Sequence, residues 1–158
     1  MKKSPQIELS NDAALNKKFG IVRALWNDNI TKRLYNGVYH TLLKHGAKKE
    51  DIEILEVPGS FELIYGAKKM FKHFEADAII VIGSIIKGET PHFHFISQSI
   101  SDGVKDLNIL FDIPFIFCVL TDLTHQQAIE RSGGKTDSII DKNKGVDSAL
   151  TAIQLIKN

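Results

Sequence analysis

Four short runs of apolar residues stand out along the chain, and each is rich in Ile, Val or Phe. They are FGIVRAL (19–25), IEILEV (52–57), DAIIVIG (77–83) and IPFIFCVL (113–120). The runs largely lack the alternation of apolar and polar residues that marks a strand with one exposed face. We therefore expect four β-strands that are buried on both faces of a sheet.

The stretches between these runs have helical spacing, because their apolar residues recur at steps of three and four positions. The recurring residues are Ile30, Leu34, Val38, Leu42 and Leu43 in 29–46, Leu63, Ala67, Met70, Phe71 and Phe74 in 60–74, and Phe93, Ile96, Ile100, Val104 and Leu107 in 91–110. Two more helices are expected at 124–132 and 145–157. Strands that alternate with helices form right-handed crossovers. The pattern predicts an α/β fold, a three-layer α/β/α sandwich around a four-stranded parallel sheet.

The part of the chain that shows strand and helix spacing indicates the domain organisation. Residues 1–18 are polar and fit neither spacing, so we expect a flexible N-terminal arm that can add an edge strand in an oligomer. Residues 19–158 form a single domain. The loop at 133–145 is rich in glycine and lysine, and Gly133 and Gly134 are placed to end the preceding helix.

Composition narrows the class of protein. The 20 basic and 19 acidic residues nearly balance, and no basic cluster indicates a nucleic-acid partner. The apolar runs are too short to span a bilayer, and the first residues lack the apolar stretch of a signal peptide. Cys118, the single cysteine, lies in the last apolar run and is expected to be a buried structural thiol. A cytoplasmic protein with no membrane partner is the expectation.

Candidate chemistry follows the strands. In an open parallel sheet, ligands bind beyond the carboxyl ends of the strands. That rule selects four loops: WNDN (26–29), PGSFE (58–62), SIIKGETPH (84–92) and TDLTH (121–125).

Two histidines, His92 and His94, begin the helix expected at 91–110, with Pro91 at its first position and Thr90 as its N-cap. Side chains two positions apart on a helix point to different sides, so the pair cannot chelate one metal ion. We expect no metal site. His92 lies where a substrate would bind and is suited to proton transfer, although a capping-region role is the alternative. His94 is interpreted as a structural or surface residue.

Other residues of these loops have two possible roles each. The GET turn before a helix start offers backbone N–H groups to an anion, and Arg131 can supply charge there or form a surface salt bridge. Trp26 can stack on a flat ring or pack in the core or in an interface. Glu62 can complement a helix dipole or accept hydrogen bonds from hydroxyls.

These loops together resemble the 6,7-dimethyl-8-ribityllumazine synthase family of riboflavin biosynthesis. The motifs that carry the resemblance are FGIV with WND (19–28), VPGSFE (57–62), GSIIKGETPHF (83–93), IPFIFCVLT (113–121), QAIERSGGK (127–135) and NKGVD (143–147). The resemblance implies a flavodoxin-like fold and a transferase. Its two small-molecule substrates are 5-amino-6-ribitylaminouracil and 3,4-dihydroxy-2-butanone 4-phosphate, and it needs no cofactor and no metal.

The resemblance also implies site residues. His92 matches the proton donor or acceptor, while Glu89, Thr90 and Arg131 match the binding residues of the butanone phosphate. The residues matched to ribitylaminouracil binding are Trp26, Ser60, Phe61, Glu62, Ser84, Ile85, Ile86 and Phe117, the last contributed by a neighbouring subunit. Asn27, Lys135 and Lys144 are further candidates.

Assembly follows from the same resemblance, which implies a homo-oligomer with active sites shared between adjacent subunits and a functional link to riboflavin synthase. TDSIID (136–141) looks like an insertion that favours a pentamer over an icosahedral shell. His94 stands where the family more often has an acidic residue. A non-catalytic, flavodoxin-like module that binds flavin or lumazine is the alternative function, and a purely structural shell protein is a third.

Overall fold

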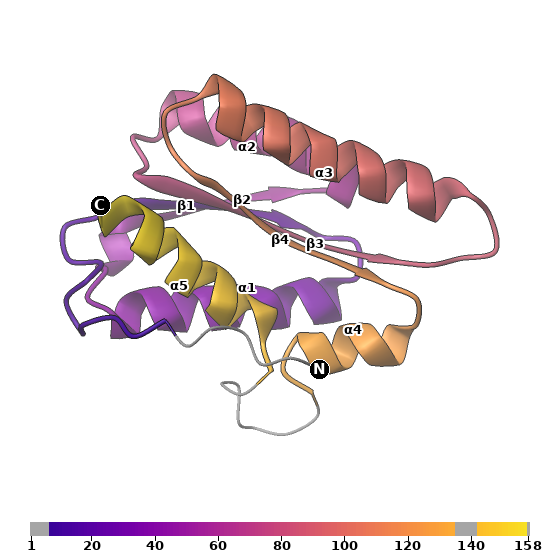
Figure 1. Cartoon of the computed structure of the whole chain (residues 1–158), viewed down its shortest axis with the longest axis horizontal. Coiled ribbons are helices and arrows are strands. Elements are labelled where there is room, and N and C mark those ends of the chain that lie inside the picture. Colours follow the sequence, from indigo (N-terminus) through magenta and orange to yellow (C-terminus); the bar gives the residue numbers. More distant parts are fainter. Residues whose placement is uncertain (1–6, 135–141, 158) are drawn as a thin grey trace.

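A computed structural model of the 158-residue chain describes residues 7–134 and 142–157. Its centre is a four-stranded parallel sheet with strand order β2-β1-β3-β4 (Figure 1). The strands are β1 (Phe19–Ala24), β2 (Ile52–Val57), β3 (Ala78–Ile86) and β4 (Phe115–Asp122). All four expected strands are present, and β3 and β4 extend beyond the apolar runs that predicted them.

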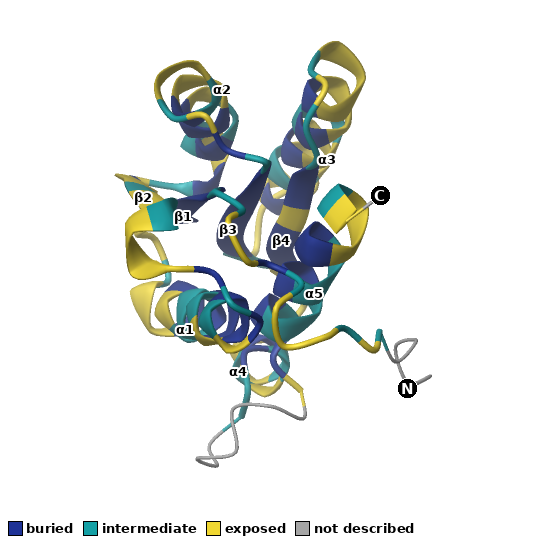
Figure 2. Ribbon diagram, turned by 90° about the vertical axis from the view of Figure 1, so that its left-hand side faces the viewer, coloured by how far each residue is buried: buried dark blue, intermediate teal, exposed yellow. Residues whose placement is uncertain are grey.

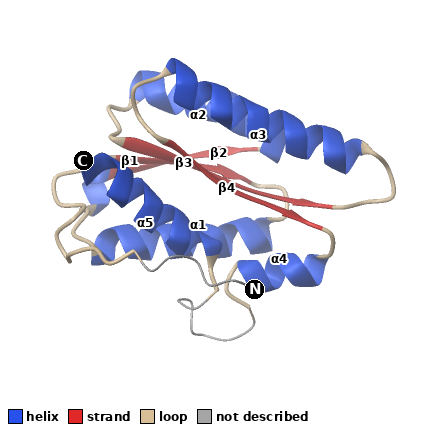
Figure 3. Cartoon of the chain, in the orientation of Figure 1, coloured by secondary structure: helices blue, strands red, loops and turns tan. Residues whose placement is uncertain are grey.

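Helices cover both faces of the sheet, as Figures 1 and 3 show. One face carries α2 (Leu63–His73) and α3 (His92–Leu110). The other carries α1 (Asp28–Lys44), α4 (His125–Arg131) and α5 (Lys144–Lys157). Short 3-10 helices, Lys49–Asp51 (η1) and Ser60–Glu62 (η2), precede β2 and α2. This arrangement confirms the predicted three-layer α/β/α sandwich with its flavodoxin-like fold.

The core forms two layers, one on each side of the sheet, and Figure 2 shows buried residues concentrated between strands and helices. Alternate strand residues separate into these layers because successive side chains point to opposite faces. Ile80 and Ile82 face α1 and α5, whereas Ile79 and Val81 face α2 and α3. The predicted helical stripes lie on these layers, so helical spacing correctly identified the buried faces.

The expectation of burial on both faces is wrong for β2. Its central residue Ile54 is 41% exposed, and Glu53 and Glu56 are exposed as well. Within the described residues β2 pairs with β1 alone, which makes it an edge strand. The Glu56 carboxylate instead accepts a hydrogen bond from Nε of the buried Arg23 over 3.2 Å.

The predicted cap of α3 is also wrong by one residue. The helix begins at His92, and Pro91 occupies the N-cap position without a side-chain capping hydrogen bond of its own. Pro91 already has a helical φ of −63°, and its carbonyl oxygen accepts a hydrogen bond from the His94 N–H over 3.0 Å. The proline thereby closes the first turn, which leaves Thr90 too far upstream to cap it.

The described part of the N-terminal arm packs on the domain and contains no strand. Residues 11–16 form turns, and Ala14 is fully buried, with its N–H donating to the carbonyl oxygen of His45 over 2.8 Å. The His45 ring lies 2.9 Å from the carbonyl oxygen of Ser10. Residues 1–6 and the TDSIID segment lie outside the described residues, so addition of an edge strand in the oligomer stays a prediction.

The outer edge of β4 is occupied at its start by a side chain. Asn108 of α3 accepts a hydrogen bond from the Phe115 N–H over 2.8 Å and donates one to the Phe115 carbonyl over 2.9 Å. Its amide thus takes the place of a neighbouring strand at this residue.

Among the described residues, no helix is both long and apolar enough to cross a membrane.

Candidate active site

A cavity of about 470 Å³ lies at the carboxyl ends of β1, β2 and β3, and we call it the strand-end pocket. Its lining residues are Trp26, Asn27, Gly59, Ser60, Phe61, Glu62, Ser84, Ile85, Ile86, Gly88, Thr90, His92, Phe93 and Ile96. Three of the four loops that the sequence selected thus meet at one place, together with the first turns of α3.

Trp26 is held at the mouth of this pocket by its backbone. Its N–H donates to the carbonyl oxygen of Pro58 over 3.0 Å, and the next residue, Asn27, adopts the left-handed conformation with φ of 59°. Asn27 Nδ2 donates to the carbonyl oxygen of Ser84 over 2.9 Å. The Trp26 side chain remains 72% exposed in the single subunit, so it is available to stack on a flat ring.

The floor of the pocket carries small polar groups. Ser60 and Ser84 are buried, and the Ser84 hydroxyl has no hydrogen-bond partner among the described residues. A side chain at Gly83 would meet Ser60 Oγ at 2.7 Å, so glycine is what allows this hydroxyl to approach β3. Glu62 Oε2 accepts from the Gly59 N–H over 2.9 Å. Such a floor suits a ligand with several hydroxyls.

The two histidines separate as the helical geometry predicts. His92 is the first residue of α3 and lines the pocket. His94 is exposed, does not line it, and packs its ring edge-on against Phe93 at 5.3 Å between centroids. The described residues contain no group of three or more His, Cys, Asp or Glu side chains that could hold a metal ion.

Glu89 was predicted to belong to the phosphate-binding turn, but the structure places it outside the strand-end pocket. Gly88 and Thr90 line the strand-end pocket, but Glu89 is exposed and does not. Its neighbours therefore present the turn to the pocket while its carboxylate lies outside.

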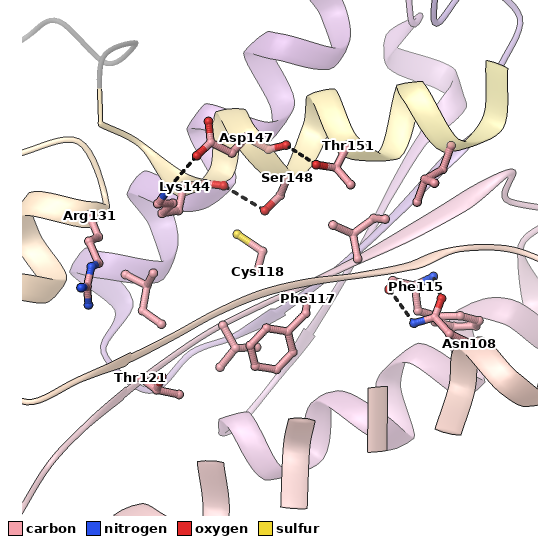
Figure 4. Close-up of a pocket in the computed structure, with 14 residues that line it drawn as sticks. Asn108, Phe115, Phe117, Cys118, Thr121, Arg131, Lys144, Asp147, Ser148 and Thr151 are labelled. Carbon is pink, nitrogen blue, oxygen red and sulfur yellow. Dashed lines mark hydrogen bonds and ion pairs between the residues drawn. The ribbon is translucent and has the colours of Figure 1, made fainter. Parts of the chain in front are cut away.

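A second, larger cavity of about 610 Å³ runs along the outer side of β4, and we call it the β4 groove (Figure 4). Its lining residues are Asn108, Phe115, Ile116, Phe117, Cys118, Val119, Leu120, Thr121, Arg131, Lys144, Asp147, Ser148, Thr151 and Leu155. Figure 4 shows the Phe117 ring on the side of β4 opposite to Cys118, whose Sγ points toward Ser148 of α5. Phe117 is 40% exposed here.

Cys118 is buried, as the sequence predicts, and burial raises the pKa of its thiol to about 12. A hydrogen bond with Ser148 acts in the opposite direction but does not offset the burial. The thiol is therefore a packing group in the wall of the groove.

Charged residues gather at one end of the β4 groove. Arg131, the last residue of α4, forms an ion pair through Nη1 with Oδ1 of Asp122, whose side chain is fully buried. Lys144 Nζ lies 2.8 Å from Asp147 Oδ2. Sequence reasoning missed Asp122, although it lies in the TDLTH loop and is the one acidic residue there. Lys135 lies outside the described residues.

The predicted site residues therefore divide into two sets that share no pocket. Trp26, Ser60 to Glu62, Ser84 to Ile86 and His92 line the strand-end pocket, whereas Phe117, Arg131 and Lys144 line the β4 groove. A single subunit does not bring the two sets together.

Comparison with known proteins gives one consistent result. The sequence pattern of the 6,7-dimethyl-8-ribityllumazine synthase family matches residues 16–158. A 6,7-dimethyl-8-ribityllumazine synthase of Flavobacterium psychrophilum is 52% identical over 142 residues, which are 90% of this chain and 72% of that protein. One from Bacteroides fragilis is 49% identical over 139 residues, 88% of this chain and 94% of that protein.

Proposed function

The chain belongs to the 6,7-dimethyl-8-ribityllumazine synthase family, and we propose that its active site forms where the strand-end pocket of one subunit meets the β4 groove of the next. The enzyme is a transferase of riboflavin biosynthesis. It condenses 5-amino-6-ribitylaminouracil with 3,4-dihydroxy-2-butanone 4-phosphate to give 6,7-dimethyl-8-ribityllumazine, phosphate and water. The close relationship to named synthases does not favour the alternative of a non-catalytic flavin-binding or lumazine-binding module.

The observation that carries the shared site is the division of the predicted residues between two cavities of one subunit. The family is homo-oligomeric, so each subunit can offer its groove to a neighbour's pocket. Phe117 would then close over the pyrimidine ring opposite Trp26, and Arg131 would reach the phosphate held by the Gly88–Thr90 turn. Head-to-tail contacts of this kind close into rings, and we propose a pentamer.

Positioning accounts for most of the proposed chemistry. The arylamine of the uracil attacks the ketone to form an imine, phosphate leaves, and the ribityl-bearing nitrogen closes the second ring. Both substrates are already reactive, so holding them in register supplies much of the acceleration. Trp26 stacks on the ring, Ser60, Phe61, Glu62, Ser84, Ile85 and Ile86 bind its edge and the ribityl chain, and His92 transfers protons between the intermediates.

Other parts of the proposal follow from the reaction. Its steps are condensation and elimination without a redox change, so we expect neither a cofactor nor a metal. The lumazine product is the substrate of riboflavin synthase, which makes that enzyme a functional partner. A cytoplasmic location fits this role.

Activity itself is tested by mixing purified protein with both substrates and following the absorbance and fluorescence of the lumazine. We expect product to form faster than in the protein-free mixture. Tight binding of the product without acceleration would instead favour a binding module.

A subunit-mixing experiment tests the shared site. Trp26→Ala impairs the strand-end pocket and Arg131→Ala impairs the β4 groove, so each variant alone forms defective sites. Co-expressed and randomly mixed, they place two intact halves together in about a quarter of the sites. Activity of the mixture above that of either variant alone is expected, and no gain would contradict a site between subunits.

A further inference from the structure

Asp122 is a buried carboxylate that the proposed chemistry does not use. It is the last residue of β4, and its backbone carbonyl accepts a hydrogen bond from the Lys87 N–H over 2.9 Å, which fixes it against β3. Its side chain is fully buried, whereas that of its ion-pair partner Arg131 is 42% exposed. The pair therefore joins a group inside the domain to one at its surface.

The pair is attached at a single point. Asp122 Oδ1 binds Arg131 Nη1, while Oδ2 is buried and has no hydrogen-bond partner in the parts of the chain that the structure describes. A buried carboxylate is costly unless its oxygens are satisfied, and a purely structural arginine pair is better served by two parallel hydrogen bonds. The Asp122–Arg131 ion pair is therefore poorly arranged to stabilise the folded protein.

An arginine that is bound to its carboxylate through one nitrogen can present its remaining N–H groups to a ligand. Arginine has five N–H donors, and the ion pair with Asp122 engages Nη1 of a side chain that lines the β4 groove. Arg131 is also the last residue of the short helix α4, after which the chain turns at Gly133 and Gly134. The helix alone gives this long side chain no fixed direction.

We propose that Asp122 is a positioning residue for phosphate recognition, which holds one edge of the Arg131 guanidinium so that the other N–H groups are ready for the phosphate of 3,4-dihydroxy-2-butanone 4-phosphate. This inference rests on the phosphate-binding role proposed for Arg131. Without the buried carboxylate, the arginine side chain has to be ordered when substrate binds. Ordering one long side chain weakens binding by about 2- to 10-fold.

Asp122→Asn tests the proposal because it removes the charge and keeps the shape. We expect the KM for the butanone phosphate to rise about 2- to 10-fold, with kcat and the KM for ribitylaminouracil unchanged. Inorganic phosphate is the second probe, and its inhibition constant should rise by the same factor. Asp122→Ser is a second variant in case the first folds poorly. Asp102→Asn, in an exposed pair with Lys105, is the matched control and should change neither constant.

The variant Arg131→Ala distinguishes the positioning role of Asp122 from the phosphate-binding role of Arg131. In the Arg131→Ala background, Asp122→Asn should have no further effect on the KM for the butanone phosphate. If Arg131→Ala raises that KM but Asp122→Asn leaves it unchanged or lowers it, the positioning role is wrong while the phosphate-binding role stands. Equal increases in both KM values together with a lower melting temperature would also overturn it, because a merely structural residue would produce them. An unchanged KM in Arg131→Ala itself would overturn both.

Discussion

The side-chain amide of Asn27 donates a hydrogen bond to the carbonyl oxygen of Ser84 over 2.9 Å and so joins the turn after β1 to the end of β3. Asn27 adopts φ of 59°, a conformation that asparagine tolerates better than most residues. The tether and the left-handed turn together place Trp26 over the strand-end pocket. Under the proposed function, Asn27 would therefore help to position Trp26 for the substrate.

Substitutions at Asn27 should separate its two contributions. Asn27→Gly keeps the backbone conformation and removes the tether, so the KM for ribitylaminouracil should rise about 2- to 10-fold, as expected for one lost hydrogen bond. Asn27→Ala additionally strains the left-handed turn and should lower the free energy of unfolding by about 1 kcal/mol relative to Asn27→Gly. Steady-state kinetics and chemical unfolding measure the two effects. An unchanged KM in Asn27→Gly would show that Trp26 needs no tether.

Replacement of His92 should slow the enzyme without abolishing turnover. General acid–base catalysis contributes about 10²–10⁴-fold where it operates, and positioning of the substrates survives in His92→Ala. The kcat should therefore fall within that factor, with the KM values little changed. His94→Ala is the control, since His94 does not line the pocket, and it should keep normal kinetics. Complete loss of turnover in a folded His92→Ala would contradict this view of the chemistry.

Replacement of Arg131 should act mainly through the phosphate-bearing substrate. A hydrogen bond to a charged group contributes about 1.5–3 kcal/mol, so Arg131→Ala should raise the KM for the butanone phosphate about 10- to 100-fold. The KM for ribitylaminouracil should remain near its original value. Lys105→Ala removes an exposed positive charge on α3 and serves as the control for a general loss of charge.

Gly145 should be intolerant of any side chain. A Cβ there would overlap the carbonyl oxygen of Leu34, so α5 could begin beside α1 only if the backbone moved. Gly145→Ala should lower the free energy of unfolding by about 1–3 kcal/mol, the usual cost of overpacking. At Gly88 a Cβ would meet no atom of the described residues within 4 Å, so thermal unfolding of Gly88→Ala should show little change.

Cys118 should make stability depend on pH in alkaline solution. Burial raises the pKa of its thiol from 9.0 to about 12 in the folded protein. Below pH 9 the thiol is protonated in both states and contributes no pH dependence. Between pH 9 and 12 the unfolded chain loses the proton first, so the free energy of unfolding falls as pH rises. Comparing Cys118→Ala with the parent by urea unfolding at pH 8 and 10 isolates this effect, which should be absent from the variant.

Much of the fold was predictable because apolar spacing reports burial directly. The stripe from Ile30 to Leu42 and the run IIVI in β3 each match a buried surface of the structure. The exposure of the edge strand β2 was missed, although IEILEV carries two glutamates, Glu53 and Glu56, and both are exposed. The prediction that Thr90 caps α3 failed for a local reason, because Pro91 itself closes the first turn.

The place of the candidate site in the fold was also partly predictable. The strand-end rule located Trp26, Ser60 and His92, whose loops do meet. It could not reveal that Phe117 and Arg131 line another cavity, since spacing along a chain does not show which residues meet within one subunit. Nor could it reveal the burial of Asp122, because a carboxylate in a polar loop is normally solvated.

The amide of Asn108 also protects the protein against disorderly association. An unpaired edge strand is a template on which foreign chains, including partly folded copies, can polymerise. With both backbone groups of Phe115 already bonded to Asn108, a strand approaching β4 cannot dock at that end, and only the later part of the edge can receive one. One asparagine thereby shortens the edge of β4 that is open to another strand, which discourages open-ended aggregation.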